Sequence, residues 1–150
     1  FIKILQSPFL KAVLICPSNP FLSIDPILAV QGVREALQGC SVPVIAVSPI
    51  IGTDSVKGPT AKIMRELGLP VSAIAVANYY RDFLDGFILD TQDEKNASEI
   101  RKMNISVKVT DILMKDLATK TKLANTVLEF SNNCSKRSLN LQKNGFSCGA

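Results

Sequence analysis

The sequence has 150 residues, of which 47% are hydrophobic and 20% charged, with a formal net charge of +4 and no histidine. A chain of this length and hydrophobicity supports one domain with a core and is too short for two ordinary domains. Residues 131–150 hold three basic residues and no acid, so only +1 belongs to the rest of the chain. We therefore expect no nucleic-acid partner.

Several classes of site are excluded by residue content. Without histidine, neither a Ser-His-Asp triad nor a histidine proton shuttle can form within the chain. The four cysteines form no C-x-x-C pair, which argues against structural zinc. No apolar run reaches the ~18 to 20 residues that span a bilayer, and no signal pattern precedes the body of the chain. We expect a cytoplasmic protein with buried, reduced thiols and no membrane partner.

The stretch 12–37 reads as a strand, a loop and a helix. Apolar residues at 12–16 give way to turn-forming residues and then to apolar residues at helical spacing. Asp25 as the N-cap and Pro26 at the first helical position predict where the helix begins.

The loop of this unit carries Ser18, Asn19 and Ser23. Hydroxyl and amide groups beside the free N–H groups of a helix N-terminus can bind a phosphate. The alternative is that these residues only turn and cap the chain, and the stretch by itself supports both interpretations.

A second junction of the same kind follows a predicted buried strand at 42–47. The segment 48–58 leads to a helix that begins at Pro59. If both strands are parallel, both loops lie at the same carboxyl edge, where open α/β folds bind ligands. The second loop offers close backbone approach, a hydroxyl and a cation, supplied by Gly52, Thr53, Lys57 and Gly58. For Lys57 alone, a solvated loop lysine is the alternative.

The rest of the body continues the alternation of strands and helices. We expect strands at 71–76, 86–90 and 105–109, a helix at 91–103 opened by a Thr91–Glu94 capping box, and a helix from Asp111 to about 128. Tyr79 and Tyr80 are read as packing residues rather than as a stacking platform for a base. This pattern predicts an α/β fold, Rossmann-like and doubly wound, with a mostly parallel sheet over residues 1–130.

Both ends of the chain depart from this pattern. Residues 131–150 show no hydrophobic period and are predicted to be a flexible tail. The chain begins with Phe1 and enters a buried type of strand within a dozen residues, so we expect that an N-terminal part of the sheet is missing.

Recognised phosphate and metal motifs do not occur. The sequence has neither G-x-x-x-x-G-K-[ST] nor G-x-G-x-x-G. Carboxylates that could hold Mg²⁺ occur singly, and a lone carboxylate is usually a cap or turn residue. They are Asp25, Asp54, Asp85 and Asp90.

Four strings resemble the 2-phospho-L-lactate transferase (CofD) family. They are ICPSNPFLSIDPILAV with GVREAL (15–37), VIAVSPIIGTDSVKGPTAKIMRELGL (44–69), SAIAVANYYRDFLDGFILD (72–90) and VTDILMKD (109–116). The similarity keeps its order over nearly all of residues 12–130.

The resemblance implies a Rossmann-like, homodimeric enzyme of coenzyme F-420 biosynthesis. Such an enzyme uses Mg²⁺, transfers a phospholactyl-type group from a guanosine diphosphate-linked donor to the deazaflavin alcohol Fo, and releases GMP. By the same analogy, the residues named in the two loops contact the nucleotide or its phosphates. Phosphoryl transfer needs positioning and charge neutralisation more than covalent help, so a site without histidine is compatible with it.

Two alternatives stay open. One is a regulatory protein of the related gluconeogenesis-factor type, which binds a nucleotide sugar, although SPIIGTDSVKGP (48–59) favours the transferase. The other is a fragment without retained function. The glycine-rich turn and the charged residues for Mg²⁺ and Fo that begin family members are not in this sequence, so we expect no transfer by this chain alone.

Overall fold

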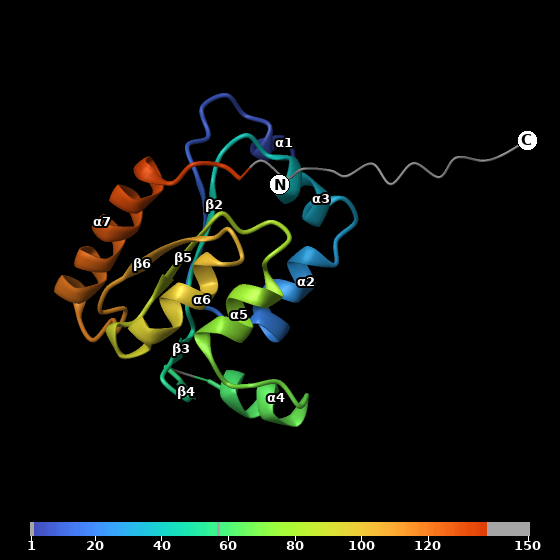
Figure 1. Ribbon diagram of the computed structural model, residues 1–150. Helices are drawn as coiled ribbons and strands as arrows, with labels where there is room; N and C mark the ends of the chain where they lie inside the picture. The colour runs from blue at the N-terminus through green and yellow to red at the C-terminus, as the bar shows by residue number, and fades with distance from the viewer. Residues whose placement is uncertain (1, 57, 138–150) are drawn as a thin grey trace, which may run out of the picture.

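The computed structural model describes residues 2–56 and 58–137. Within them, a four-stranded parallel sheet lies between the long helix α7 on one face and shorter helices on the other (Figure 1). The strands are β1 (Val13–Ile15), β2 (Val44–Val47), β5 (Gly86–Leu89) and β6 (Ser106–Val109), with a separate pair β3 (Ile50–Ile51) and β4 (Asp54–Ser55). The α/β Rossmann-like class predicted from the sequence is confirmed.

The helices are mostly short. They are α1 (Ile2–Leu5), α2 (Asp25–Leu28), α3 (Val33–Gly39), α4 (Thr60–Glu66), α5 (Ala73–Tyr79), α6 (Ala97–Arg101) and α7 (Leu117–Asn133), with a π-helix η1 (Pro20–Ile24) and a 3-10 helix η2 (Thr91–Asn96).

The sheet has the order β1-β2-β5-β6, with every neighbouring pair parallel. The carboxyl ends of all four strands therefore share one edge, as predicted for the first two. The antiparallel hairpin β3–β4 follows β2 at this edge.

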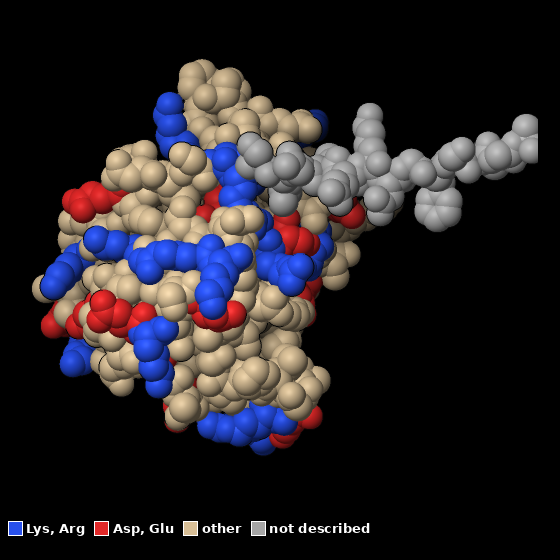
Figure 2. Space-filling model, viewed as in Figure 1, with Lys and Arg blue, Asp and Glu red and all other residues tan. Residues whose placement is uncertain are grey.

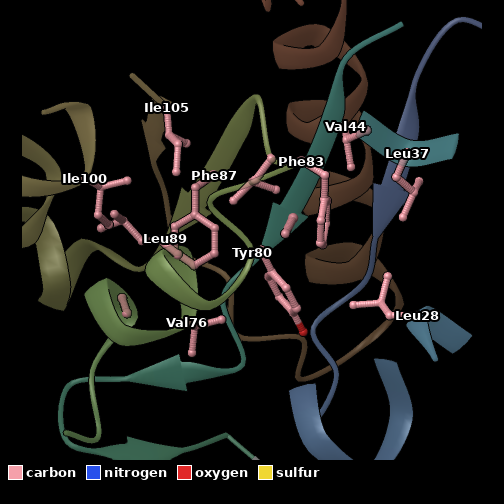
Figure 3. Close-up of a cluster of buried hydrophobic side chains, with 14 of the residues drawn as sticks. Leu28, Leu37, Val44, Val76, Tyr80, Phe83, Phe87, Leu89, Ile100 and Ile105 are labelled. Carbon is pink, nitrogen blue, oxygen red and sulfur yellow. The ribbon is translucent and has the colours of Figure 1, made fainter. Parts of the chain in front are cut away.

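Successive side chains of a strand point to opposite faces of the sheet, so the sheet contributes to two hydrophobic cores. Val44 and Ala46 of β2 contact the shorter helices, while Ile45 and Val47 contact α7. Because both faces are covered, β2 and β5 are buried throughout. Figure 3 shows the first core, where the rings of Tyr80, Phe83 and Phe87 lie among aliphatic side chains.

The strand predicted at 71–76 is wrong, because this segment begins helix α5. The Ser72 hydroxyl accepts a hydrogen bond from the Ala75 N–H at 3.1 Å and caps the helix. Positions 73, 76, 77 and 80 are all buried, which is the period of a helix.

Three predicted helix starts are also corrected. The helix predicted from Asp111 begins at Leu117, because the Asp116 side chain caps it there. Asn19, not Asp25, is the cap of the first helical segment, which runs through η1 and α2 and is interrupted before α3. The predicted Thr91–Glu94 capping box is replaced by Asp90, whose carboxylate accepts a hydrogen bond from the Gln92 N–H at 3.0 Å.

The predicted boundary between body and tail, at residue 131, falls inside α7, which continues to Asn133. Lys136 and Arg137 then contact the buried carboxylate of Asp85. The rest of the predicted tail, 138–150, lies outside the described residues.

Charged side chains of both signs lie on the surface (Figure 2), and two of the described cysteines are buried. Figure 2 shows Lys and Arg interspersed with Asp and Glu on the face seen there. Cys40 and Cys134 are buried free thiols, as predicted, whereas Cys16 is exposed. Among the helices that the structure describes, none has the length and apolar character needed to cross a membrane.

Candidate functional site

A cavity of about 210 Å³ lies at the carboxyl edge of the sheet. The segments that follow β1, β2 and β6 meet there with the first turn of α7. Its lining consists of Pro17, Ser18, Asn19, Pro49, Val56, Thr60, Leu113, Met114 and Lys120. Two of the residues predicted from the first loop, Ser18 and Asn19, are thus brought to one cavity with residues of the second segment.

Asn19 has a double function in this loop. Its Oδ1 accepts hydrogen bonds from the N–H groups of Phe21 and Leu22, at 2.9 and 3.1 Å, and so caps η1. Its Nδ2 is buried and has no hydrogen-bond partner within the described chain. A buried donor without an acceptor is costly, so this atom is suited to an acceptor on a ligand.

Ser23 does not line the cavity, because it lies within η1 and is exposed. Its N–H donates to the Asn19 carbonyl at 3.0 Å, which is a contact of the helix itself. The capping and turning role considered for this loop therefore accounts for Ser23 and for part of Asn19.

Gly52 and Thr53 form the turn of the β3–β4 hairpin and lie outside the cavity lining. The Gly52 N–H donates to Oδ2 of Asp93 at 2.9 Å, so this donor is already engaged. Gly52 has a φ of 64°, a left-handed conformation that glycine adopts at low cost. Thr53 is exposed, and its carbonyl accepts a hydrogen bond from Arg65 at 3.2 Å.

Gly58 is exposed with a φ of 73°, and its carbonyl accepts a hydrogen bond from the Ser55 hydroxyl at 2.8 Å. Lys57, predicted as the cation of this loop, lies outside the described residues. From the second segment the structure places Pro49, Val56 and Thr60 on the cavity instead.

Two buried aspartates near the end of β5 hold the segments around the cavity. Asp93 anchors the β3–β4 hairpin through Gly52. Asp90 accepts a hydrogen bond from the Ile112 N–H at 3.1 Å and so fixes the segment after β6. Burial raises the pKa of Asp93 above its usual value, and the Gly52 N–H partly offsets this effect.

Thr60 and Lys120 are lining residues that were not predicted as site residues. Thr60 is 1% exposed and begins α4, directly after Pro59 at the predicted helix start. Lys120 directly follows the capping box of α7. In this box the Asp116 carboxylate accepts a hydrogen bond from the Thr119 N–H at 2.8 Å, and the Thr119 hydroxyl accepts one from the Asp116 N–H. This hydrogen bond holds the pKa of Asp116 below its usual value and fixes the turn that carries Lys120.

The lining favours an anion. Ser18 and Thr60 offer hydroxyls, Asn19 offers an amide donor, and Lys120 offers a positive charge. Among the described residues of the lining, none is a carboxylate. A cavity with donors, one cation and no acid suits a phosphate or carboxylate group of a ligand.

Mg²⁺, expected from the family resemblance, is not supported by these residues. Within 2–56 and 58–137, no group of three or more Asp, Glu or Cys side chains is close enough together to hold a metal ion. The four carboxylates considered from the sequence have other partners: Asp54, Asp85 and Asp90 accept backbone N–H groups, and Asp25 accepts a hydrogen bond from the Tyr79 hydroxyl. The described part of this chain therefore does not fit an all-protein Mg²⁺ site.

A second, larger cavity of about 440 Å³ lies between η1, α4 and α5 and has a mostly apolar lining. Tyr79 contributes to it while packing edge to face on Phe21, with ring centroids 5.3 Å apart. Tyr80 packs on Tyr79 at 5.6 Å and is buried. Packing, the interpretation favoured for these rings, agrees with these contacts.

Comparison with known proteins gives one family. The family model described as "2-phospho-L-lactate transferase CofD" matches residues 9–128. The 2-phospho-L-lactate transferase of Methanosarcina barkeri is 41% identical over 116 residues, which are 77% of this chain and 37% of that protein.

Two further relatives give matches of similar length. The phosphoenolpyruvate transferase of Kitasatospora aureofaciens is 39% identical over 117 residues, 77% of this chain and 36% of that protein. The 2-phospho-L-lactate transferase of Methanocaldococcus jannaschii is 39% identical over 118 residues, 79% of this chain and 36% of that protein. The chain thus spans little more than a third of the length of these relatives.

Proposed function

Because this chain belongs to the 2-phospho-L-lactate transferase (CofD) family, we propose that it supplies the donor-phosphate site of such a transferase. The donor is a guanosine diphosphate-linked phospholactyl-type compound, and the acceptor is the deazaflavin alcohol Fo. The single observation that supports this assignment is the cavity at the sheet edge, whose described lining has donors and a cation but no acid. The transferase names of the relatives above favour this function over a nucleotide-sugar-binding regulator.

In the proposed reaction, the acceptor's hydroxyl oxygen attacks the phosphorus that bears the lactyl group. A new O–P bond forms, the bond from that phosphorus to the bridging oxygen breaks, and GMP leaves with the electron pair. The hydroxyl proton is lost to solvent or buffer. Donors placed around the diphosphate stabilise the charge that develops on the leaving GMP. We assign this role to the Ser18 and Thr60 hydroxyls and to Nδ2 of Asn19.

The remaining residues predicted for the site have a narrower role in this proposal. Gly52, Thr53 and Gly58 lie outside the cavity lining, so they would contact only parts of a ligand that extend beyond it. Ser23, which is exposed within η1, has no ligand contact in this proposal. Mg²⁺ and a homodimer remain part of the proposal from the family, with metal ligands expected outside the described residues.

The assignment of Asn19 is tested by calorimetric titration of the 150-residue chain with GDP, using a UDP-sugar as the control ligand. In Asn19→Asp the cap of η1 is kept, because aspartate caps as well as asparagine, but the Nδ2 donor becomes an oxygen. We expect at least ten-fold weaker GDP binding with an unchanged thermal midpoint. Ser23→Ala, at the exposed position nearby, should bind GDP as the wild type does.

Three outcomes would contradict the proposal. Equal GDP affinity in wild type and Asn19→Asp would remove Asn19 from the site. Preference for the UDP-sugar would favour the regulatory relative. A folded chain that binds neither ligand would show that the cavity does not bind the donor.

A further inference from the structure

We propose that Lys120 is the residue that binds and neutralises a phosphate group at this cavity, an inference that rests on the proposed function. Lys120 lies in the first turn of α7, far along the chain from the loop of Ser18 and Asn19, yet all three line the same cavity. The fold therefore brings to the site a cation from outside the two predicted loops.

The ammonium group of Lys120 is available for a ligand. Within the described chain, the ion pairs of other cations engage Arg34, Lys62, Lys102, Lys136 and Arg137, and Lys120 makes none. Its side chain also makes no hydrogen bond to a described residue, and it is exposed at the cavity.

The surroundings of Lys120 favour one orientation of its side chain, with the ammonium group toward the polar cavity. Besides the polar cavity, Lys120 borders an apolar groove of about 150 Å³ formed with β1, β2 and α7, where Leu14 and Val47 are neighbours. A lysine stem packs well on apolar surface, whereas its ammonium needs water or an anion. We infer that the stem lies along the groove and that the ammonium points into the polar cavity.

Nδ2 of Asn19 gives independent support for an anion at this place. This atom is buried without an acceptor, and its residue lines the same cavity as Lys120. An uncharged donor and a cation on two residues that line the same cavity are complementary to an oxyanion, and the diphosphate of the proposed donor carries such groups.

The test uses the 150-residue chain with its lysines dimethylated by ¹³C-formaldehyde, observed by NMR during titration with inorganic diphosphate. Lys120→Gln identifies the Lys120 signal. Lys122→Gln is the matched control, because Lys122 is an exposed lysine of the same helix that lines neither the cavity nor the groove.

We expect the Lys120 signal to shift saturably and the Lys122 signal to stay in place. In unlabelled protein, Lys120→Gln should weaken diphosphate binding at least ten-fold, Lys120→Arg should restore most of it, and Lys122→Gln should change it less than two-fold. A stationary Lys120 signal, or equal losses in Lys120→Gln and Lys122→Gln, would overturn the assignment.

A parallel GDP titration separates this inference from the proposed function. Wild-type GDP binding that is unchanged in Lys120→Gln would refute Lys120 as the phosphate residue and leave the function intact. A Lys120 signal that responds equally to diphosphate, GDP and a UDP-sugar would support the anion site and count against a guanine-nucleotide donor. Binding of none of these ligands would overturn both.

Discussion

Tyr79 donates its hydroxyl hydrogen to the carboxylate of Asp25, at the rim of the larger cavity. Burial, followed by this hydrogen bond, raises the pKa of Tyr79 to about 12. The ordinary pKa of tyrosine is about 10, so the neutral form is favoured in the folded protein. The resulting stabilisation is fully present below pH ~10 and is lost as the pH rises through about 12.

Tyr79→Phe should therefore remove part of the alkaline sensitivity of the fold. We expect the difference in unfolding free energy between wild type and Tyr79→Phe to decrease by about 1 kcal/mol between pH 9 and 12, because solvent screens this half-buried group. Urea unfolding of both proteins across this range measures the difference. A difference that is constant with pH would contradict the role of the Tyr79 hydroxyl.

Gly86 shows how one missing side chain lets α7 approach the sheet. A Cβ at this position would lie 2.9 Å from a ring carbon of Phe130 and 3.1 Å from Sγ of Cys134. We expect Gly86→Ala to cost about 1 to 3 kcal/mol of unfolding free energy in urea denaturation. Gly39→Ala is the matched control, since nothing lies within 4 Å of its Cβ position. Equal stability of the two variants would contradict the close packing at Gly86.

At the scale of elements, the β3–β4 hairpin depends on a partner from another part of the chain. A two-residue turn with strands this short has little stability of its own. Its anchor is Asp93, whose carboxylate accepts the Gly52 N–H. The hairpin therefore keeps its place beside the cavity because η2 holds it.

Replacement of Asp93 separates the hydrogen bond from the charge. In Asp93→Ala, the Gly52 amide should exchange its hydrogen at least ten-fold faster, because it loses its acceptor. In Asp93→Asn, the side-chain oxygen can still accept the Gly52 N–H, while the longer hydrogen bond from Asn96 Nδ2 at 3.3 Å is lost, so protection of the Gly52 amide at pH 7 should match that of wild type. Amide exchange followed by NMR distinguishes the two, and similar exchange in both variants would show that Asp93 does not hold the hairpin.

Elements with a clear local signal could be predicted from the sequence. The strands at 12–16, 42–47, 86–90 and 105–109 are confirmed. At 42–47 and 86–90 the signal is a run of apolar residues bounded by turns, which is typical of strands buried in a parallel sheet. The segment 71–76 was ambiguous, since a short apolar run fits a strand and a buried helix equally well. The helix forms because Ser72 caps its N-terminus and because the segment is rich in alanine, the residue with the highest helix propensity.

The candidate site could be predicted only in part. Ser18 and Asn19 follow a strand directly, so their place at the sheet edge follows from local sequence. Lys120 reaches the cavity only because α7 packs across the sheet. The local sequence around Lys120 does not predict such a tertiary contact. Gly52 carried a plausible phosphate signal, but a tertiary hydrogen bond to Asp93 uses its N–H.

At the scale of the whole molecule, the segment 134–137 packs at the edge of the sheet where the strands begin and is held there by Lys136 and Arg137. The carboxylate of Asp85 is 1% exposed and accepts hydrogen bonds from the N–H groups of Val44 and Arg137 and from Nζ of Lys136, at 2.8, 2.9 and 3.0 Å. The Arg137 guanidinium also donates to the Met103 carbonyl at 3.0 Å. This contact set joins the end of the described chain to the starts of β2, β5 and β6.

Removal of the buried carboxylate should be costly. We expect Asp85→Ala to lower the unfolding free energy by about 3 to 5 kcal/mol, because it leaves Lys136 uncompensated and two N–H groups without an acceptor. Asp82→Ala is the control: Asp82 pairs with Arg34, with both side chains about one-third exposed, and should lose about 1 kcal/mol or less. Guanidinium denaturation that gives equal losses would contradict a structural role for residues 134–137.

The strand order also has a consequence for how the chain is made. Each strand of the sheet pairs with the preceding one, so pairing can advance as the nascent chain leaves the ribosome. Among the described residues, the face of Ile45, Val47 and Ile88 is covered mainly by α7, the last of the described helices to emerge. At ~5 to 20 residues per second, synthesis from β6 to the end of α7 takes about 1 to 5 s. During that interval the growing sheet presents an apolar face, and this is where we expect a chaperone to engage it.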